Sequence, residues 1–323
     1  MTENVISAAA EDQAVRHEDV AAPPRVAVVI VTYNSADVLE RCLRSLTPVG
    51  VELKVVVVAD NGSRDDSLTI AKAAATDLPI LTVELGRNAG YAAAINTGIA
   101  AIDTTSLDAV MVLNPDCVLR ADTIRLLWNA LREPGRGIAV PRLLDPDGSL
   151  QPSLRRTPTV GRALAEAVLG KYAGQIGTIG ELISDPRKYA EPGPAVWATG
   201  AAMLVLTRAM HDVGPWDESF LLYSEETEFA LRAADKGWSL WYEPAAVVEH
   251  KGGESGTSPK LAALLIVNKV ELFRRRHGAV RSTAFYLVTL FGEALRTLYG
   301  RRTSRASVSA LLKPAARTRV LAD

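Results

Sequence analysis

The sequence predicts an α/β fold with a doubly wound, mostly parallel sheet, and three observations lead to this prediction. Four apolar runs, rich in β-branched residues, recur between residues 25 and 132, and each is typical of a strand buried on both faces. Segments with apolar residues at helical spacing separate these runs. Each run also ends abruptly in polar residues. Such regular alternation of strands and helices is typical of a sheet covered by helices on both sides.

The predicted elements follow one another without long gaps. The first strand, "RVAVVIVTYN", precedes a helix that Ser35 is expected to cap. The second strand, "LKVVVVADNGS", precedes a helix at about residues 65–75. The third, "PILTVEL", precedes a loop and a helix within residues 86–102. The fourth, "DAVMVLNPD", precedes a helix at about residues 121–132.

The second half of the chain has a different composition. Residues 141–195 are rich in Pro, Gly and Arg and only partly periodic, whereas "AVWATGAAMLVL" and "SLWYEPAAVVEH" again predict strands. A helix is expected to begin near Glu225. The last 55 or so residues predict two amphipathic helices with basic clusters.

Charge and cysteine content exclude several classes of protein. The net charge of −1 argues against a general nucleic-acid-binding protein. Residues 269–323 nevertheless hold twelve Lys and Arg residues against three acidic ones, which indicates that this end meets an anionic surface. Two cysteines make neither a disulfide framework nor a zinc site, and no run approaches the roughly 20 apolar residues of a membrane span. Because the N-terminal residues also lack a signal-peptide pattern, we expect a cytoplasmic location.

Polar residues gather where the predicted strands end. Ligands of open α/β sheets bind outside the carboxyl ends of the strands, so these residues are expected to share one edge of the sheet. Each group alone is equally consistent with a turn, but unrelated turns need not converge. The sequence has neither G-x-G-x-x-G after the first strand nor G-x-x-x-x-G-K-[ST], so a bound phosphate must be neutralised by another group. Asp116, after the fourth strand, suggests a divalent cation, Mg²⁺ or Mn²⁺.

An ordered series of motifs carries a resemblance to a known family. The series is "VVIVTYNSADVLERCLRSL", "VVADNGSRDDS", "RNAGYAAAINTGI", "VLNPD", "TGAAMLV", "WDESFLLYSEETEFALRA" and "VVEHKGG". It resembles the inverting family 2 glycosyltransferases, which have the GT-A fold, over about residues 25–253. Within that family it is most similar to bacterial rhamnosyltransferases that assemble cell-wall polysaccharide or its lipid-linked precursors.

The resemblance implies a nucleotide-sugar site built at the four strand ends. Its residues would be Thr32, Tyr33, Asn34, Asp60, Asn88, Gly90, Asn114 and Asp116. Asp60 would accept a hydrogen bond from the imide N–H of thymine or uracil. Asn114-Pro115-Asp116 occupies the place of the family's D-x-D motif, with Asp116 as metal ligand and Asn114 near the ribose. His250 matches a position that can supply a second metal ligand, although a lone His is often structural.

The resemblance also implies the catalytic group. The family usually reads E-D-x-D where this chain has "EETE", so Glu226 takes the place of the general base and Glu225 lies beside it. A carboxylate there would remove the proton of the acceptor hydroxyl while the metal stabilises the leaving diphosphate. The alternative is an acidic first helical turn, favoured by the helix dipole. Thr199, Gly200 and Ala201 would form the floor between donor and acceptor. Arg155 and Arg156 either clamp a diphosphate or belong to a solvated basic loop.

The composition of the two ends, together with the extent of the resemblance, implies a domain organisation. Residues 1–24 are expected to form a disordered leader, and residues 25–255 the GT-A catalytic domain. Residues 25–132 would be its nucleotide-binding half and residues 133–255 its acceptor and catalytic half. Residues 256–323 would form a basic amphipathic helical tail. The tail either makes peripheral contact with the inner face of the cell membrane or packs on the catalytic domain, in a monomer or a homodimer.

The implied activity is the transfer of L-rhamnose from dTDP-rhamnose to a cell-wall or polyprenyl-diphosphate-linked glycan, with inversion. A UDP-hexose or galactofuranosyl transferase is an open alternative, because uracil offers Asp60 the same imide. A protein that binds a nucleotide sugar without catalysis is another, because Asn114 and Glu226 depart from the family pattern. A nucleotidyltransferase is disfavoured, because "TYNSADVLE" is not the Gly-rich basic loop that such an enzyme needs.

Overall fold

One mixed sheet organises residues 25–250 of the protein. The computed structural model describes residues 22–47, 50–252 and 258–313. In these residues the sheet has nine strands, in the order β3-β2-β1-β4-β10-β6-β11-β5, with β8 paired to β11. The strands β1 (Arg25–Thr32), β2 (Glu52–Asp60), β3 (Ile80–Glu84) and β4 (Ala109–Leu113) run parallel, as the sequence predicts.

The second half of the sheet brings the later motifs to the same edge. The strand β10 (Ala202–Leu206) lies antiparallel between β4 and β6 (Arg136–Leu144). The strand β11 (Ser239–His250) runs parallel to β6 and antiparallel to the short strands β5 (Cys117–Leu119) and β8 (Gly193–Ala195). The register pairs His250 with Cys117, which places the histidine beside Asp116.

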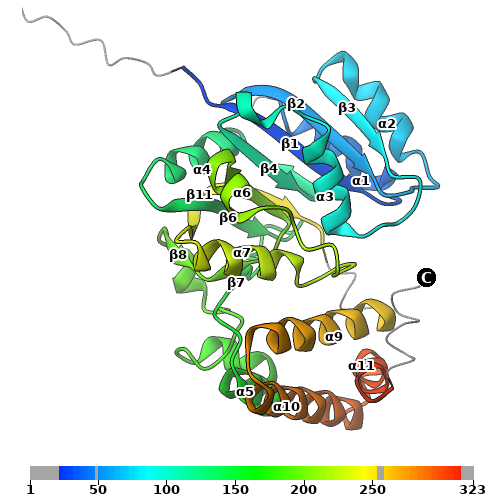
Figure 1. Cartoon of the computed structure of the whole chain (residues 1–323), viewed down its shortest axis with the longest axis vertical. Coiled ribbons are helices and arrows are strands. Elements are labelled where there is room, and N and C mark those ends of the chain that lie inside the picture. Colours follow the sequence, from blue (N-terminus) through cyan, green and yellow to red (C-terminus); the bar gives the residue numbers. More distant parts are fainter. Residues whose placement is uncertain (1–21, 48–49, 253–257, 314–323) are drawn as a thin grey trace, which may run out of the picture.

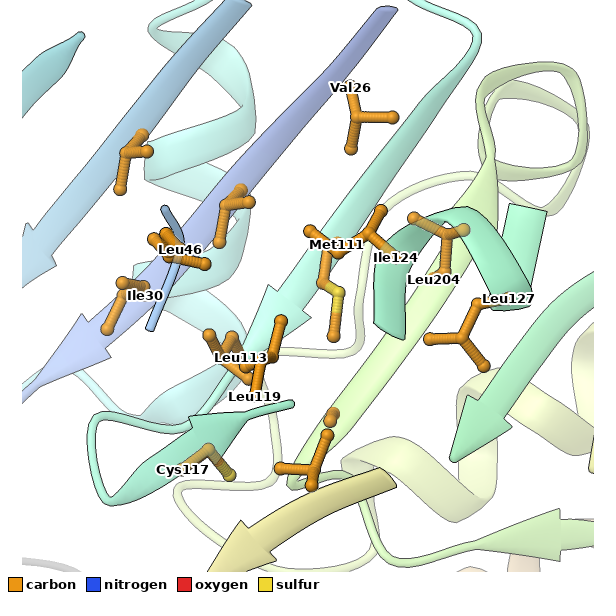
Figure 2. Packing of buried hydrophobic residues seen from close by; sticks show 14 of the residues in the cluster. Val26, Ile30, Leu46, Met111, Leu113, Cys117, Leu119, Ile124, Leu127 and Leu204 are labelled. Carbon is orange, nitrogen blue, oxygen red and sulfur yellow. The ribbon is translucent and has the colours of Figure 1, made fainter. Parts of the chain in front are cut away.

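Helices cover both faces of the sheet, so the doubly wound prediction is confirmed (Figure 1). They are α1 (Ala36–Arg44), α2 (Ser67–Ala73), α3 (Tyr91–Ala100), α4 (Thr123–Leu131), α6 (Thr207–Val213) and α7 (Glu225–Asp235). Alternate residues of β1 enter two separate cores: Val28 and Ile30 contribute to one, Ala27 and Val29 to the other. Figure 2 shows the first core, where side chains of β1 and β4 meet those of α4. Burial on both faces explains why these strands are continuously apolar.

A helical layer lies at the end of the molecule remote from β1–β3 (Figure 1). It contains α5 (Val160–Leu169), the 3₁₀ segment η3 (Gly170–Gln175), α9 (Pro259–Arg276), α10 (Ala279–Leu298) and α11 (Arg302–Leu312). The strands β7 (Leu154–Arg155) and β9 (Trp197–Ala198), on either side of α5 and η3 in the chain, pair in a small second sheet. The remaining 3₁₀ segments of the described residues are η1 (Ala74–Thr76), η2 (Thr104–Ser106) and η4 (Pro186–Tyr189). Among the helices described here, none combines the length and the apolar character needed to cross a bilayer.

Ion pairs and hydrogen bonds hold α9 against residues 217–235, which include α7. Asn268 Nδ2 donates to the carbonyls of Leu222 and Tyr223, at 2.9 and 3.2 Å. Arg275 and Arg276 form ion pairs with Asp217 and Asp235, at 2.9 and 2.7 Å. These arginines therefore hold the tail against the domain.

The basic tail differs from the sequence prediction in its number of helices. The tail was expected to hold two helices, but residues 259–312 hold three. Ser258 caps α9 through Leu261 N and Pro259 occupies its first turn, while Gly300, at φ +83°, separates α10 from α11. Most of the predicted leader, residues 1–21, lies outside the described residues. The domain boundaries stay a prediction.

Candidate active site

A fixed carboxylate lies at the ends of β1 and β2. The register pairs Thr32 with Asp60, and Thr32 Oγ1 donates to Asp60 Oδ1 at 3.0 Å. Asp60 Oδ2 accepts from the backbone N–H groups of Gly62 and Ser63, at 3.2 and 3.0 Å. Asp60 is only 2% exposed. These bonds fix the orientation of the carboxylate and leave acceptor capacity on Oδ1 for a ligand N–H.

The residues after β1 join the two neighbouring loops. Asn34 has a left-handed backbone, with φ +51°, and its Oδ1 accepts from Arg64 N at 2.8 Å. Its own N–H donates to Ser63 Oγ at 3.0 Å. Tyr33, between Thr32 and Asn34, is 48% exposed. The loop thus exposes one aromatic ring, next in sequence to the Thr32 that bonds to Asp60.

Asn88 and Gly90 are held by a residue that the sequence prediction left out of the site, Asn61. Asn61 Nδ2 donates to Asn88 Oδ1 at 2.9 Å, and Asn61 Oδ1 accepts from Ala89 N at 2.8 Å. Gly90 has φ +101°, and a Cβ there would lie 2.7 Å from the carbonyl oxygen of Leu221. The close approach that Gly90 permits is therefore to the 221 loop. The motif "DNGS" carried the signal for Asn61, next to Asp60.

Asp116 and His250 face each other across β5 and β11. His250 Nε2 lies 3.5 Å from Asp116 Oδ1, while Asp116 Oδ2 accepts from Gly252 N at 2.9 Å. The other ring nitrogen, Nδ1, lies 2.6 Å from Gln151 Oε1. The amide of Gln151 is oriented by a 2.7 Å bond from its Nε2 to Asp145 Oδ1. Oε1 can only accept, so Nδ1 carries the ring proton and Nε2 keeps its lone pair.

The chemistry of this pair fits a divalent cation. Burial lowers the pKa of His250, against the opposing effect of the Asp116 charge, and so favours the neutral ring. A lone pair and a carboxylate oxygen then face each other without a proton between them, and a cation would join them. Ligand atoms of Asp116, Cys117 and His250 lie within 4.8 Å of one another. Burial raises the pKa of Cys117 well above its usual range, and its Sγ donates to the Ala201 carbonyl, so the thiol is not a ligand.

Tyr91, a second residue that the prediction left out, connects this pair to the predicted floor. Tyr91 Oη donates to Asn114 Oδ1 at 2.7 Å and lies 3.3 Å from the Gly200 carbonyl oxygen. Asn114 Nδ2 is 3.5 Å from His250 Nε2, and Asn114 N donates to the Ala201 carbonyl at 2.8 Å. Asn114 thus contacts Ala201 through its backbone N–H, and Tyr91 and His250 through its side chain. Its neutral side chain adds no charge next to Asp116.

The two predicted catalytic carboxylates begin α7. Ser224, just before them, has a left-handed backbone with φ +78°. Within the described residues, Oε2 of Glu225 and Oε2 of Glu226 are buried and have no hydrogen-bond partner. Burial and the charge of Glu226 raise the pKa of Glu225 well above its usual range, and burial raises the pKa of Glu226. Unpaired carboxylates with raised pKa values are typical of functional sites.

The third acidic residue of this turn has a different role. Glu228 forms a 2.8 Å ion pair with Arg232 one turn later. Arg232 also donates to the carbonyls of Val213 and Pro215, at 2.6 and 2.8 Å. This pair fastens α7 to the loop after α6 and leaves Glu225 and Glu226 as the acidic groups available for chemistry.

Glu226 lines a cavity of about 430 Å³. Gly200 lies so close to Glu226 that a Cβ on Gly200 would be 3.0 Å from Glu226 Cβ. Thr199, the residue before Gly200, lines the cavity. The lining includes three basic side chains, those of Arg155, Lys269 and Arg276. It also includes five apolar or aromatic side chains: Trp197, Leu231, Leu265, Leu272 and Phe273. Asp116 and His250 are not among its lining residues. Gly200 and Tyr91 therefore connect Glu226 to the Asp116–His250 pair.

The two adjacent arginines differ in their surroundings. Arg156 donates to the carbonyls of Gly180 and Gly177, both at 2.8 Å, so it holds a loop. Arg155 lies over the ring of Trp197, 5.4 Å from its centroid, and faces the cavity. Its charge opposes the burial that raises the pKa of Glu226. Of the two, Arg155 is the one placed to act on a ligand.

Comparison with known proteins agrees with this geometry. Residues 27–176 match the family described as Glycosyl transferase family 2. The chain is 33% identical over 242 residues to the N-acetylglucosaminyl-diphospho-decaprenol L-rhamnosyltransferase of Mycobacterium tuberculosis, covering 72% of this chain and 78% of the relative. The chain belongs to glycosyltransferase family 2. This family 2 protein is a glycosyltransferase, and its resemblance to the rhamnosyltransferases of the family is confirmed.

Solved structures show that this family 2 enzyme has the GT-A fold. A mannosyltransferase from Pyrobaculum calidifontis, in complex with GDP-Man and Mn²⁺, matches with a TM-score of 0.56 and 17% identity. That match covers 93% of this chain and 84% of the mannosyltransferase. GalNAc-T7, solved with UDP, GalNAc and Mn²⁺, also has a TM-score of 0.56 and 17% identity, over 77% of this chain and 48% of that one.

Proposed function

We propose that this enzyme transfers L-rhamnose from dTDP-rhamnose to a polyprenyl-diphosphate-linked glycan, with inversion at the anomeric carbon. One observation supports this class of reaction: a continuous series of contacts connects the Asp116–His250 pair to Glu226. The residues between them are Asn114, Tyr91 and Gly200. The mycobacterial relative supports the choice of sugar and of acceptor. A lipid-linked acceptor would place the enzyme at the cytoplasmic face of the membrane.

The donor nucleotide is proposed to bind at the ends of β1 and β2. Asp60 Oδ1 would accept the imide N–H of thymine, and the exposed ring of Tyr33 would pack against the base. Uracil carries the same imide, so a UDP-hexose is the second candidate donor. Asn114, already bonded to Tyr91, would orient the ribose or the diphosphate.

Asp116 and His250 would hold a divalent cation, Mg²⁺ or Mn²⁺. When bound, this cation neutralises the leaving nucleoside diphosphate. Gln151 Oε1 accepts the Nδ1 proton and would thereby leave the Nε2 lone pair available to the cation. Gly252 N occupies Asp116 Oδ2, which leaves Oδ1 as the oxygen that faces His250.

Glu226 is the proposed general base. The acceptor hydroxyl would enter the cavity beside Glu226, and its proton would pass to the carboxylate as its oxygen bonds to the anomeric carbon. The bond from that carbon to the diphosphate oxygen breaks, and dTDP leaves with the electron pair. A single displacement of this kind inverts the anomeric centre. Arg155 and the ring of Trp197 would contact the acceptor's phosphate and sugar, respectively.

A binding screen followed by a transfer assay tests this proposal. Because a ligand that binds the native state raises the melting temperature, dTDP-rhamnose with Mn²⁺ should raise it more than UDP-glucose or UDP-galactofuranose. Incubation with a polyprenyl-diphosphate-linked N-acetylglucosamine should then give a rhamnosylated product of inverted configuration. A larger shift with a UDP-sugar would replace the donor, and retention of configuration would remove Glu226 as base.

A further inference from the structure

The exposed apolar side chains of this protein are concentrated in one part of the helical layer. Fourteen large hydrophobic side chains are exposed in the described residues, and eleven of them lie within residues 164–179 and 280–299. The helices α5 and α10, which carry most of these residues, lie at the end of the molecule opposite β1–β3 (Figure 1). Exposed apolar patches of this extent are typical of surfaces that meet a partner or a membrane.

The helix α10 is apolar on both its buried and its exposed sides. Its exposed residues, Val280, Leu287, Phe291 and Leu298, are 85%, 55%, 51% and 84% exposed. Their spacing of seven, four and seven residues places them on one helical face. Phe285 and Gly292, which lie about 120–140° around the helix from that face, are buried. A helix that is apolar all round normally has a covering on both sides, and in the described residues α10 has one on one side only.

The segment α5–η3 packs against this buried flank of α10 and lies in the same helical layer. Gly292 of α10 packs so closely on Ala167 that a Cβ would approach within 2.9 Å, and Arg296 donates to the Glu166 carbonyl at 2.9 Å. The segment exposes its own apolar residues: Leu164, Val168, Leu169, Tyr172, Ile176 and Ile179. These six residues and the four of α10 are called the α5–α10 face below.

The exposed charges on the segments that form the α5–α10 face, and on the adjoining α11, are all of one sign. In the described residues 160–179 and 279–313, the exposed charged residues are all basic: Lys171, Arg281, Arg301, Arg302, Arg305 and Lys313. The two acidic residues of these segments are not exposed, and each is ion-paired, Glu166 with Lys269 and Glu293 with Arg296. An apolar face with a basic border fits a bilayer that contains anionic lipids. A second copy of the chain would bring basic groups against basic groups.

We propose that the α5–α10 face docks this enzyme on an anionic lipid bilayer. The docking surface uses α10 of the basic tail but not the arginines at the end of α9, because Arg275 and Arg276 form ion pairs with Asp217 and Asp235. It also includes α5 and η3, which precede the tail by about 100 residues. The inference deepens the proposed function, since a lipid-linked acceptor would then lie near α9, which lines the Glu226 cavity through Leu265 and Leu272.

Vesicle flotation of the full-length protein tests the docking surface. Vesicles of phosphatidylcholine alone are compared with vesicles of phosphatidylcholine and phosphatidylglycerol in equal amounts. The wild type should float with the anionic vesicles, and Leu287→Glu/Phe291→Glu should lower the partition coefficient by at least about tenfold. Leu81→Glu, which changes an exposed apolar residue of β3, is the matched control and should float like the wild type. Arg301→Gln/Arg302→Gln/Arg305→Gln should lose at least about tenfold on anionic vesicles.

Two results would overturn the docking surface. The first is equal flotation of the wild type and Leu287→Glu/Phe291→Glu. The second is a concentration-dependent dimer, measured by light scattering, that Leu287→Glu/Phe291→Glu dissociates while vesicle binding is unchanged. Flotation needs no turnover, and the donor-induced shift in melting temperature needs no vesicles. A failure of the docking surface and a failure of the proposed activity are therefore distinguishable.

Discussion

His250 Nδ1 lies 2.6 Å from Gln151 Oε1, and this contact determines which ring nitrogen faces Asp116. Gln151 is itself oriented by Asp145 and donates more weakly, at 3.3 Å, to the His250 carbonyl. A histidine whose second nitrogen is fixed in this way is prepared as a metal ligand rather than as a proton carrier. The arrangement makes Gln151 a positioning residue for the proposed metal site.

Removing the amide of Gln151 should therefore weaken metal binding without removing a ligand. We expect Gln151→Ala to raise the Mn²⁺ concentration for half-maximal activity by about 10- to 100-fold. The double variant Gln151→Glu/Asp145→Asn keeps an acceptor for the Nδ1 proton and a donor–acceptor pair between residues 145 and 151, so it should recover most of the affinity. Titration of Mn²⁺ in the transfer assay measures both variants. Equal metal requirements for wild type and Gln151→Ala would show that the contact is only structural.

The two proposed ligands should differ in the severity of their loss. Asp116→Ala removes the charged member of the proposed ligand pair and should abolish both activity and the Mn²⁺-dependent part of donor binding. His250→Ala keeps the carboxylate, so activity should return at a higher Mn²⁺ concentration. Calorimetric titration with Mn²⁺ in the presence of dTDP checks the affinities directly. An unchanged metal requirement in His250→Ala would assign the histidine to a structural role.

Glu226 and Glu225 can be separated by paired substitutions, because only Glu226 lines the cavity next to Gly200. Glu226→Gln should reduce kcat by at least about 100-fold, the usual contribution of a general base, and leave donor binding intact. Glu225→Gln keeps the base and should reduce kcat much less. Thermal shift with dTDP-rhamnose confirms that both variants bind donor. The reverse ranking of the two variants would move the base to Glu225.

The activity should have an acid limb that Arg155 controls. Burial raises the pKa of Glu226 above its usual 4.5, and the charge of Arg155 opposes this effect. The base acts only when ionised, so kcat/KM should rise with pH through that raised pKa. Arg155→Met removes the opposing charge and should move the limb to higher pH. Arg156→Met, which loses only loop contacts, is the control and should leave the limb in place.

The first half of the fold and the gathering of polar residues at one sheet edge could be predicted because their signals are local. Each strand is a continuous apolar run, and each ends in a polar motif at the same edge of the sheet. Gln151 and Tyr91 could not be assigned in this way. Gln151 meets His250 across 99 residues and lies in a segment without periodicity, and Tyr91 resembles an ordinary first residue of a helix. Their roles depend on tertiary contacts.

The helical layer was harder to predict for a related reason. The helix α5 begins where Thr159 Oγ1 accepts from Arg162 N at 3.1 Å, but its partner α10 begins more than 100 residues later. Its small face, with Ala163 and Ala167 buried, makes sense only against that partner. The proposed domain boundary at residue 256 consequently divides two helices that pack together, α5 and α10.

A buried ion cluster joins these elements and should control their stability. Lys269 Nζ lies 2.9 Å from Glu181 Oε2 and 3.4 Å from Glu166 Oε2, and Glu166 Oε1 also accepts from Glu181 N at 2.8 Å. Lys269→Met would leave two buried carboxylates without a cation, which should lower the free energy of unfolding by about 3–5 kcal/mol. Lys72→Met, which breaks the exposed pair with Glu84, is the control and should cost far less.

The same cluster predicts how stability depends on pH. Burial would raise the pKa of Glu166, but Lys269 and two backbone N–H groups outweigh it and lower the pKa below 4.5. A carboxylate with a lowered folded-state pKa contributes stability above its unfolded pKa and loses it as the pH falls through the folded pKa. Urea unfolding at neutral pH and at about pH 4 should therefore show a decrease that Glu166→Gln reduces. An identical acid-induced decrease in wild type and Glu166→Gln would assign it to other carboxylates.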